Sequence, residues 1–159
     1  MRTFWRSALI AVGTVTVFAA PGTAQAPSPE SVLGFAPGAD FHLATYEESV
    51  DYFQRLAAAS DRITMVRTGQ TSEGRDWWIA LISTPENLAQ AESYREIADQ
   101  LAHPAELTDE AARALAVRGK AIVDVNGGLH ASEVAGAQHT IQLAYELVTS
   151  EEPRVAAIR

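Results

Sequence analysis

The sequence contains no cysteine and has few basic side chains. Without cysteine no disulfide can form, so the fold must be held by its apolar core and by any metal ion that it binds. Twenty acidic residues against twelve basic ones give a formal net charge of −8. This charge argues against binding to nucleic acid or to an anionic membrane surface. The sequence also lacks an apolar run of the roughly 20 residues that a membrane-spanning helix needs.

The composition is that of an ordinary globular protein. Of the 159 residues, 47% are apolar and 20% are charged, which predicts a single domain with a core of its own. The alternation of strand-like and helix-like segments described below favours the α/β class.

The N-terminus has the pattern of a secretory leader. Arg2 and Arg6 precede an uncharged stretch from Ser7 to Ala20, and Ala24-Gln25-Ala26 supplies the small residues of a signal-peptidase site. We expect residues 1–26 to be a signal peptide, cleaved after Ala26 or Ala24, and the protein to be secreted or periplasmic. An uncleaved anchor is the alternative, and no other contact with a membrane is expected.

The domain begins after a polar approach that contains Pro and Gly. Residues 27–44 are expected to form an extended arm, and residues 45–159 to form the domain. Thr45 and Glu48 form a capping box, which predicts the start of a helix. Val50, Phe53, Leu56 and Ala57 recur on one face of this helix, which should end near Ser60.

A β-hairpin should follow this helix. Ile63 to Thr68 and Trp77 to Ser83 have the composition of strands, and the polar residues 69–75 form the turn between them. Successive strand side chains alternate, so at most one of Trp77 and Trp78 can face the first helix. We expect both to pack in the protein and not to contact substrate.

Two helices and a strand complete the pattern. Thr84-Pro85-Glu86 marks a helix start, and residues 87–102 continue it with helical spacing. A second helix opens at Thr108 and is expected to close at Gly119 in a left-handed cap. The run Ala121 to Asn126 is apolar enough for a buried strand of an α/β sheet. Asp124 interrupts it, either as a hydrogen-bonded structural group or as a group that orients a metal ligand.

His130 and Glu133 follow this strand and the turn pair Gly127-Gly128. Side chains three residues apart at a helix entry lie about 5 to 6 Å apart at Cβ, so an imidazole nitrogen and a carboxylate oxygen can reach one ion at roughly 2.0 to 2.2 Å. The spacing alone is weak evidence, because this composition gives about one His-x-x-Glu by chance in every three such chains.

Position separates this pair from the other histidines. His103 and Glu106 have the same spacing but lie between two helices, where Pro104 favours an extended His103, so we expect an ordinary loop. His42 has no spaced partner. His139 lies about 600° round the helix from Glu133 and is expected to be a polar helix residue and not a third ligand. His130 alone follows a predicted strand, where ligands of open α/β sheets gather.

The segment Asp124-Val125-Asn126-Gly127-Gly128-Leu129-His130-Ala131-Ser132-Glu133-Val134 resembles the first metal-binding segment of the zinc carboxypeptidase family. Gly69-Gln70-Thr71-Ser72-Glu73-Gly74-Arg75 is similar to the Gly-x-Ser/Thr-x-Glu-Gly-Arg hairpin that precedes it in that family. The order of elements agrees from about Tyr46 to Val148. Two departures are the helix around Tyr94, absent from the digestive members, and Ser132, where those enzymes usually have arginine. Their substrate contacts therefore cannot be carried over.

This resemblance implies the first part of a three-layer α/β/α fold with a mixed central sheet, truncated in this chain. It implies one zinc ion held by His130, Glu133 and a later histidine, with a later glutamate that activates water for attack on a peptide bond of the substrate. The later histidine and glutamate would lie beyond Arg159, so we expect this chain alone to be inactive. The oligomeric state is open.

Two other functions are compatible with the same residues. One is a peptidoglycan stem-peptide or N-acyl amino acid amidohydrolase on the same scaffold, which would use the same two ligands. The other is an exported, non-catalytic binding module whose metal site has decayed. The presence of both His130 and Glu133 argues against the second.

Overall fold

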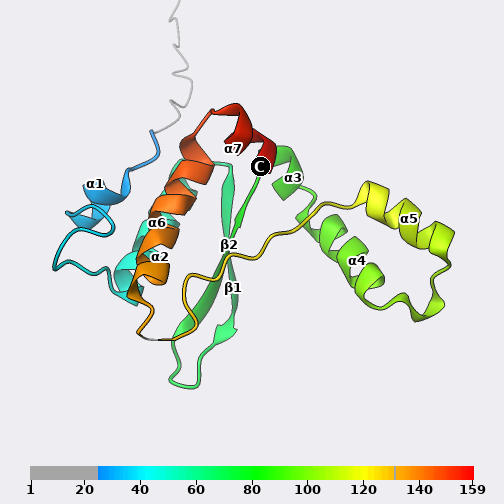
Figure 1. Ribbon diagram of the computed structural model, residues 1–159, viewed down its shortest axis with the longest axis horizontal. Coiled ribbons are helices and arrows are strands. Elements are labelled where there is room, and N and C mark those ends of the chain that lie inside the picture. The colour runs from blue at the N-terminus through cyan, green and yellow to red at the C-terminus, as the bar shows by residue number, and fades with distance from the viewer. Residues whose placement is uncertain (1–24, 131) are drawn as a thin grey trace, which may run out of the picture.

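The computed structural model describes residues 25–130 and 132–159, so most of the expected signal peptide, residues 1–24, lies outside the described residues. The main body is an antiparallel hairpin packed against two helices, α2 and α6, and a helical pair, α4 and α5, stands to one side (Figure 1). The elements, in chain order, are α1 (Pro29–Leu33), α2 (Tyr46–Ala59), β1 (Ile63–Gln70), β2 (Asp76–Ile82), α3 (Pro85–Leu88), α4 (Ala91–Ala102), η1 (Pro104–Glu106), α5 (Asp109–Arg118), α6 (Val134–Thr149) and α7 (Pro153–Ile158).

The capping box predicted for the first long helix is present. The backbone N–H of Glu48 donates to the Thr45 hydroxyl at 3.2 Å, and the Glu48 carboxylate accepts the backbone N–H of Thr45 at 2.8 Å. Two N–H groups that the first turn leaves without helical partners are thereby satisfied. α2 ends at Ala59 with Ser60 as its C-cap, so both predicted ends are confirmed.

The predicted hairpin is also confirmed. β1 and β2 are antiparallel, Ile63 pairs with Ile82, and a bulge interrupts the register between Arg67 and Gly69. In the turn, Gly74 has φ 78°, a left-handed conformation that costs glycine little.

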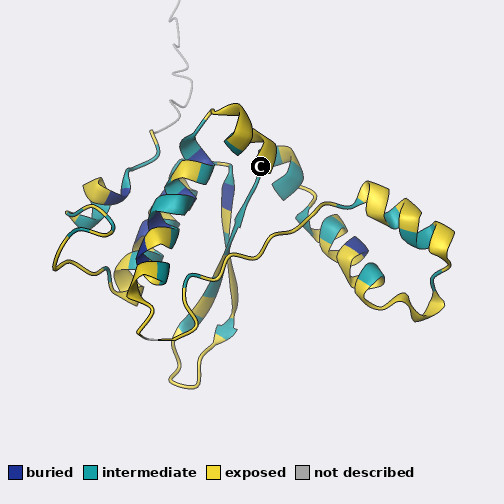
Figure 2. Ribbon diagram, in the orientation of Figure 1, coloured by how far each residue is buried: buried dark blue, intermediate teal, exposed yellow. Residues whose placement is uncertain are grey.

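One face of the hairpin carries the core. The buried residues of β1, α2 and α6 lie on these facing elements (Figure 2), and their side chains form one cluster. The buried members of this cluster are Tyr52, Leu56, Ile63, Ile141, Ala144 and Val148. The opposite face, the outer face of the hairpin, is partly exposed to solvent. Val66, Ile79 and Trp77 on it are 38%, 47% and 61% exposed. The expectation that Trp77 packs in the interior is therefore wrong, whereas Trp78 is half-buried.

Two local expectations need correction. The arm 27–44 contains a short helix, α1, because the Ser28 hydroxyl accepts the N–H of Ser31 and Pro29 stands at the first helical position. Gly119 follows α5, but its φ of −75° is not left-handed. A Cβ at Gly119 would lie 3.1 Å from Cγ2 of Ile97, so glycine fits there because α4 approaches closely.

The segment 121–126 is extended but is not a strand. Its backbone forms no strand pairing with any described residue, and Ile122 and Val123 are 67% and 80% exposed. The prediction of a buried strand is wrong for this structure. An apolar run becomes a buried strand only where neighbouring strands accept its hydrogen bonds, and in the described part of the chain β1 and β2 pair only with each other.

The predicted helix at residues 87–102 is divided into α3 and α4 by a break at Ala89 and Gln90. α5 starts after its cap Thr108, as predicted. Within residues 25–130 and 132–159, no helix has the length and apolarity needed to cross a membrane.

Candidate metal centre

The candidate metal loop, residues 127–133, leads directly into α6. Glu133 is the N-cap residue of this helix. Gly128 has φ 150°, a conformation that side chains rarely adopt, and a Cβ there would lie 3.3 Å from the carbonyl oxygen of Glu133. The Gly-Gly pair is therefore required by the backbone path and by the close approach of loop and helix.

The carboxylate of Glu133 accepts hydrogen bonds from the backbone of this loop. Its Oε2 accepts the backbone N–H of Leu129 at 2.8 Å and that of His130 at 3.1 Å. In addition, the N–H of Glu133 donates to the carbonyl oxygen of His130 at 3.0 Å. Hydrogen bonds from backbone N–H groups to an ionised carboxylate are among the stronger ones in proteins. One carboxylate oxygen is therefore held by the backbone, and the other, Oε1, is not used in these bonds.

Oε1 is the oxygen that lies near His130. Nε2 of His130 is 3.9 Å from Oε1 of Glu133, and the two side chains are 75% and 47% exposed. Two ligands about 2.0 to 2.1 Å from a tetrahedral zinc ion lie about 3.3 Å apart. The pair fits two positions of a zinc site if the exposed imidazole moves by about 0.6 Å toward the carboxylate.

The remaining histidines do not join this pair. Among residues 25–130 and 132–159, no group of three or more His, Cys, Asp or Glu side chains could hold a metal ion. His139 uses Nδ1 to donate to the carbonyl oxygen of Gly136 at 2.6 Å on the exposed surface of α6. His103 caps the end of α4, and Glu106 ends the 3₁₀ turn η1, as expected for an interhelix connection. His42 lies in the arm with Nδ1 2.9 Å from the carbonyl oxygen of Asp40.

Asp124 has neither of its expected roles in this structure. It is exposed in the extended segment 121–126, and its side chain makes no hydrogen bond to another described residue. The sequence did not reveal the anchoring of Glu133 by two backbone N–H groups. A glutamate at a helix N-cap beside a Gly-Gly turn is the signal that could have indicated it.

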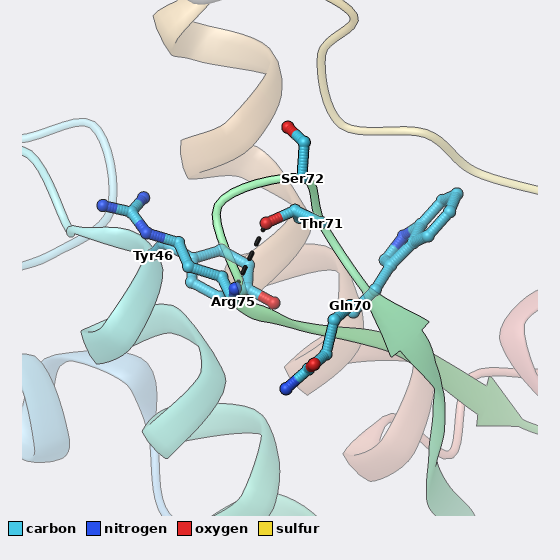
Figure 3. A pocket seen from close by; sticks show the side chains of 6 residues that line it. Tyr46, Gln70, Thr71, Ser72 and Arg75 are labelled. Carbon is cyan, nitrogen blue, oxygen red and sulfur yellow. Dashed lines mark hydrogen bonds between the residues drawn. The ribbon is translucent and has the colours of Figure 1, made fainter.

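A second feature lies at the hairpin turn. The turn is closed by the Thr71 hydroxyl, which accepts the backbone N–H of Arg75 at 3.2 Å (Figure 3). An open hollow of about 580 Å³ lies beside it, lined by Tyr46, Gln70, Thr71, Ser72, Arg75 and Trp77. All six residues are exposed, and Nε of Arg75 is 4.0 Å from a Glu47 carboxylate oxygen. This hollow is a surface feature of the motif that precedes the metal loop.

Comparison with known proteins gives a family match. No curated protein and no solved structure matches the chain. The family described as zinc carboxypeptidase matches residues 49–159, a range that contains the hairpin, the metal loop and α6. Its members are zinc metallopeptidases, which act on peptides, and the mixture of helix and strand seen here is compatible with an α/β fold. Since the matched range covers more than half of the sequence, the chain belongs to the zinc carboxypeptidase family.

Proposed function

We propose that this chain contributes His130 and Glu133 to the single zinc site of a metallocarboxypeptidase, which hydrolyses peptide bonds at the C-terminal end of a peptide. The observation that carries the proposal is the convergence of Nε2 of His130 and Oε1 of Glu133 at 3.9 Å within the range that matches the family.

The two side chains would have different parts in holding the metal. Glu133 has one oxygen fixed by the N–H groups of Leu129 and His130, so its second oxygen is oriented before any metal arrives. His130 is more exposed and can adjust its ring to complete the pair. The chemistry that zinc supplies in such a site is that of a Lewis acid, which polarises a carbonyl group and makes water more acidic.

We propose that a third protein ligand and a general base come from residues outside this chain. A catalytic zinc site has three protein ligands, and among residues 25–130 and 132–159 no third such side chain joins His130 and Glu133. Further support comes from the apolar surface that the described residues leave uncovered, on the outer face of the hairpin and along residues 121–126. Such surface is usually buried against other elements of a domain.

The test uses the 159-residue chain and zinc chloride. In spectra that resolve the imidazole nitrogens of the four histidines, zinc should shift the signals of His130 and leave those of His103 in place. Glu133→Ala should abolish this shift of the His130 signals, and the matched control His103→Ala should keep it. A shift of His130 that survives Glu133→Ala would remove Glu133 from the site, and zinc shifts at His103 without a shift at His130 would remove His130.

Peptidase activity provides a second, separate test. A two-ligand site should hold zinc weakly, so the purified chain should not release C-terminal residues from a peptide. Zinc-dependent release by this chain alone would contradict the proposal that the third ligand and the base lie elsewhere.

We also propose that the protein is exported. Arg2 and Arg6, the uncharged stretch Ser7–Ala20 and the small residues at 24–26 support this, although residues 1–24 lie outside the part that the structure describes. Sequencing the N-terminus of protein recovered from an expressing culture should give a chain that starts at Gln25 or Pro27, outside the cytoplasm. A cytoplasmic chain that starts at Met1 would contradict export.

A further inference from the structure

Gly127 and Gly136 let the metal loop lie directly on the first turns of α6. A Cβ built on Gly136 would overlap the carbonyl oxygen of Gly127. A Cβ built on Gly127 would lie 2.5 Å from Cγ2 of Thr140 and 3.0 Å from the carbonyl oxygen of Gly136. Non-bonded carbon atoms prefer about 3.5 to 4.0 Å. Because backbone atoms face each other in this contact, a side-chain rotation cannot make room for a larger residue.

Helix propensity does not explain glycine at position 136. Gly136 is the third residue of α6, and its φ lies outside the left-handed region, so an alanine could adopt the same backbone. Glycine in a helix is less favourable than alanine. The absence of a side chain at this position is therefore explained by the space that Gly127 needs.

This contact joins the start of the metal loop to the first turn of α6. Gly127 precedes His130 by three residues, and Gly136 follows Glu133 by three, so the contact holds the start of the loop against the first turn of the helix that follows it. Moving Gly127 away from α6 would pull on the N–H groups of Leu129 and His130, which bind the Glu133 carboxylate. It would also widen the 3.9 Å separation of the two candidate ligands.

We propose that Gly136 is a positioning residue for the metal site, which acts by letting Gly127 pack against α6. The inference rests on the proposed zinc binding by His130 and Glu133. A protein group that orients a metal ligand typically changes metal affinity by about 10- to 100-fold when it is replaced.

The first experiment compares Gly136→Ala with Ala135→Gly in the full chain. Ala135 is exposed on the same turn of α6, so its replacement lowers helix propensity without touching Gly127. With zinc as the probe, Gly136→Ala should weaken the response of the His130 ring by about 10- to 100-fold. Ala135→Gly should lower the melting temperature and keep the wild-type zinc affinity, which separates positioning from a general loss of stability.

A second pair of variants applies if Gly136→Ala does not fold. Thr140→Ser removes the methyl group that lies over Gly127 and keeps the hydroxyl, which donates to the carbonyl oxygen of Ala137 at 2.8 Å. Thr140→Val keeps the methyl group and loses the hydroxyl. Zinc affinity should fall for Thr140→Ser and stay unchanged for Thr140→Val. The opposite order would overturn the proposal.

The metal-free protein gives a readout that does not depend on zinc. The amide proton signals of Leu129 and His130 report their hydrogen bonds to Glu133, and they should shift in folded Gly136→Ala and not in Ala135→Gly. Unchanged amide signals and unchanged zinc affinity in folded Gly136→Ala would refute the role of Gly136. If zinc does not shift the His130 ring signals of the wild-type chain, the proposed function is refuted. If the amide signals of Leu129 and His130 nevertheless shift in Gly136→Ala, the positioning of Glu133 by Gly136 stands.

Discussion

Gln138 is a buried polar side chain on α6, 6% exposed, that joins this helix to the chain just before α2. Its amide accepts the backbone N–H of Ala44 at 2.9 Å and donates to the carbonyl oxygen of Ala44 at 3.0 Å. Both polar groups of Ala44 are thereby satisfied by one side chain, as a neighbouring strand would satisfy them. Removing that side chain would leave a partly buried N–H and C=O without partners.

We therefore expect Gln138→Leu to lower the free energy of unfolding by about 1 to 3 kcal/mol, the usual cost of leaving a buried polar group without its hydrogen bond. Urea denaturation at neutral pH measures this change. Gln142→Leu is the matched control, because the half-buried Gln142 donates to the exposed Glu146 on the same helix and makes no bond to Ala44, and it should change stability little. Equal effects of the two substitutions would show that the bonds to Ala44 do not stabilise the protein.

The carboxylate of Glu48 at the N-terminus of α2 makes the stability of the protein depend on pH. The backbone N–H and the hydroxyl of Thr45 donate to its carboxylate and lower the pKa of Glu48 below its ordinary value. A lowered pKa in the folded state contributes stability above the unfolded pKa, and this contribution is lost as pH falls through the folded pKa.

The expected outcome is a steeper loss of stability in acid for the wild-type protein than for Glu48→Gln. Glutamine keeps an acceptor for the N–H of Thr45 but carries no charge that protonation could remove. Melting temperatures measured from neutral pH down to about pH 3 should converge as the carboxylate is protonated. Parallel curves over this range would exclude Glu48 as the source.

At the scale of elements, the sequence predicted those that local signals define. The capping box of Thr45 and Glu48 indicated the start of α2, and the alternation on either side of residues 69–75 indicated the hairpin. Both signals act through neighbours a few residues away. The short helix α1 also has a local signal, Ser28 followed by Pro29, within the segment predicted to be an extended arm.

Elements and contacts that depend on distant residues were predicted less well. The run 121–126 has the composition of a buried strand, but a strand needs partners that sequence composition does not place. Gly119 was assigned a left-handed cap, whereas its role is steric and comes from Ile97 on another helix. At the candidate site, spacing indicated His130 and Glu133, but the packing of Gly127 on Gly136 could not be read from the sequence.

The main core contains Leu56 of α2, and replacing this residue tests how far the core stabilises the protein. This side chain is fully buried in the cluster shared by α2, β1 and α6. Replacing it with alanine removes apolar contacts and leaves a cavity, so Leu56→Ala should lower the free energy of unfolding by about 2 to 5 kcal/mol. The control is Val117→Ala on α5, where the side chain is 87% exposed and little should change. Chemical denaturation of both variants measures the difference, and similar small losses would mean that this cluster is not the stabilising core.

At the scale of the whole molecule, we expect backbone amides in different segments to differ in their protection from hydrogen exchange. The backbone of residues 121–126 makes no hydrogen bond to any described residue, whereas α6 is hydrogen-bonded and buries Ile141, Ala144 and Val148. Amide exchange depends on opening of such bonds. We expect the amides of 121–126 to exchange at nearly the rate of an unfolded chain and those of residues 141–148 to be the slower set, as measured by mass spectrometry. Strong protection of 121–126 would mean that this segment pairs with a strand in solution.

The fluorescence of Trp77 can report on the outer face of the hairpin. The indole of Trp77 lies there, 61% exposed, beside the partly exposed side chains of Val66 and Ile79. Emission from an indole in water lies at longer wavelength than that from a buried one and is readily quenched by acrylamide. Trp77→Phe identifies its share of the spectrum. Any polypeptide that comes to cover this face will move that share toward the blue and shield it from the quencher.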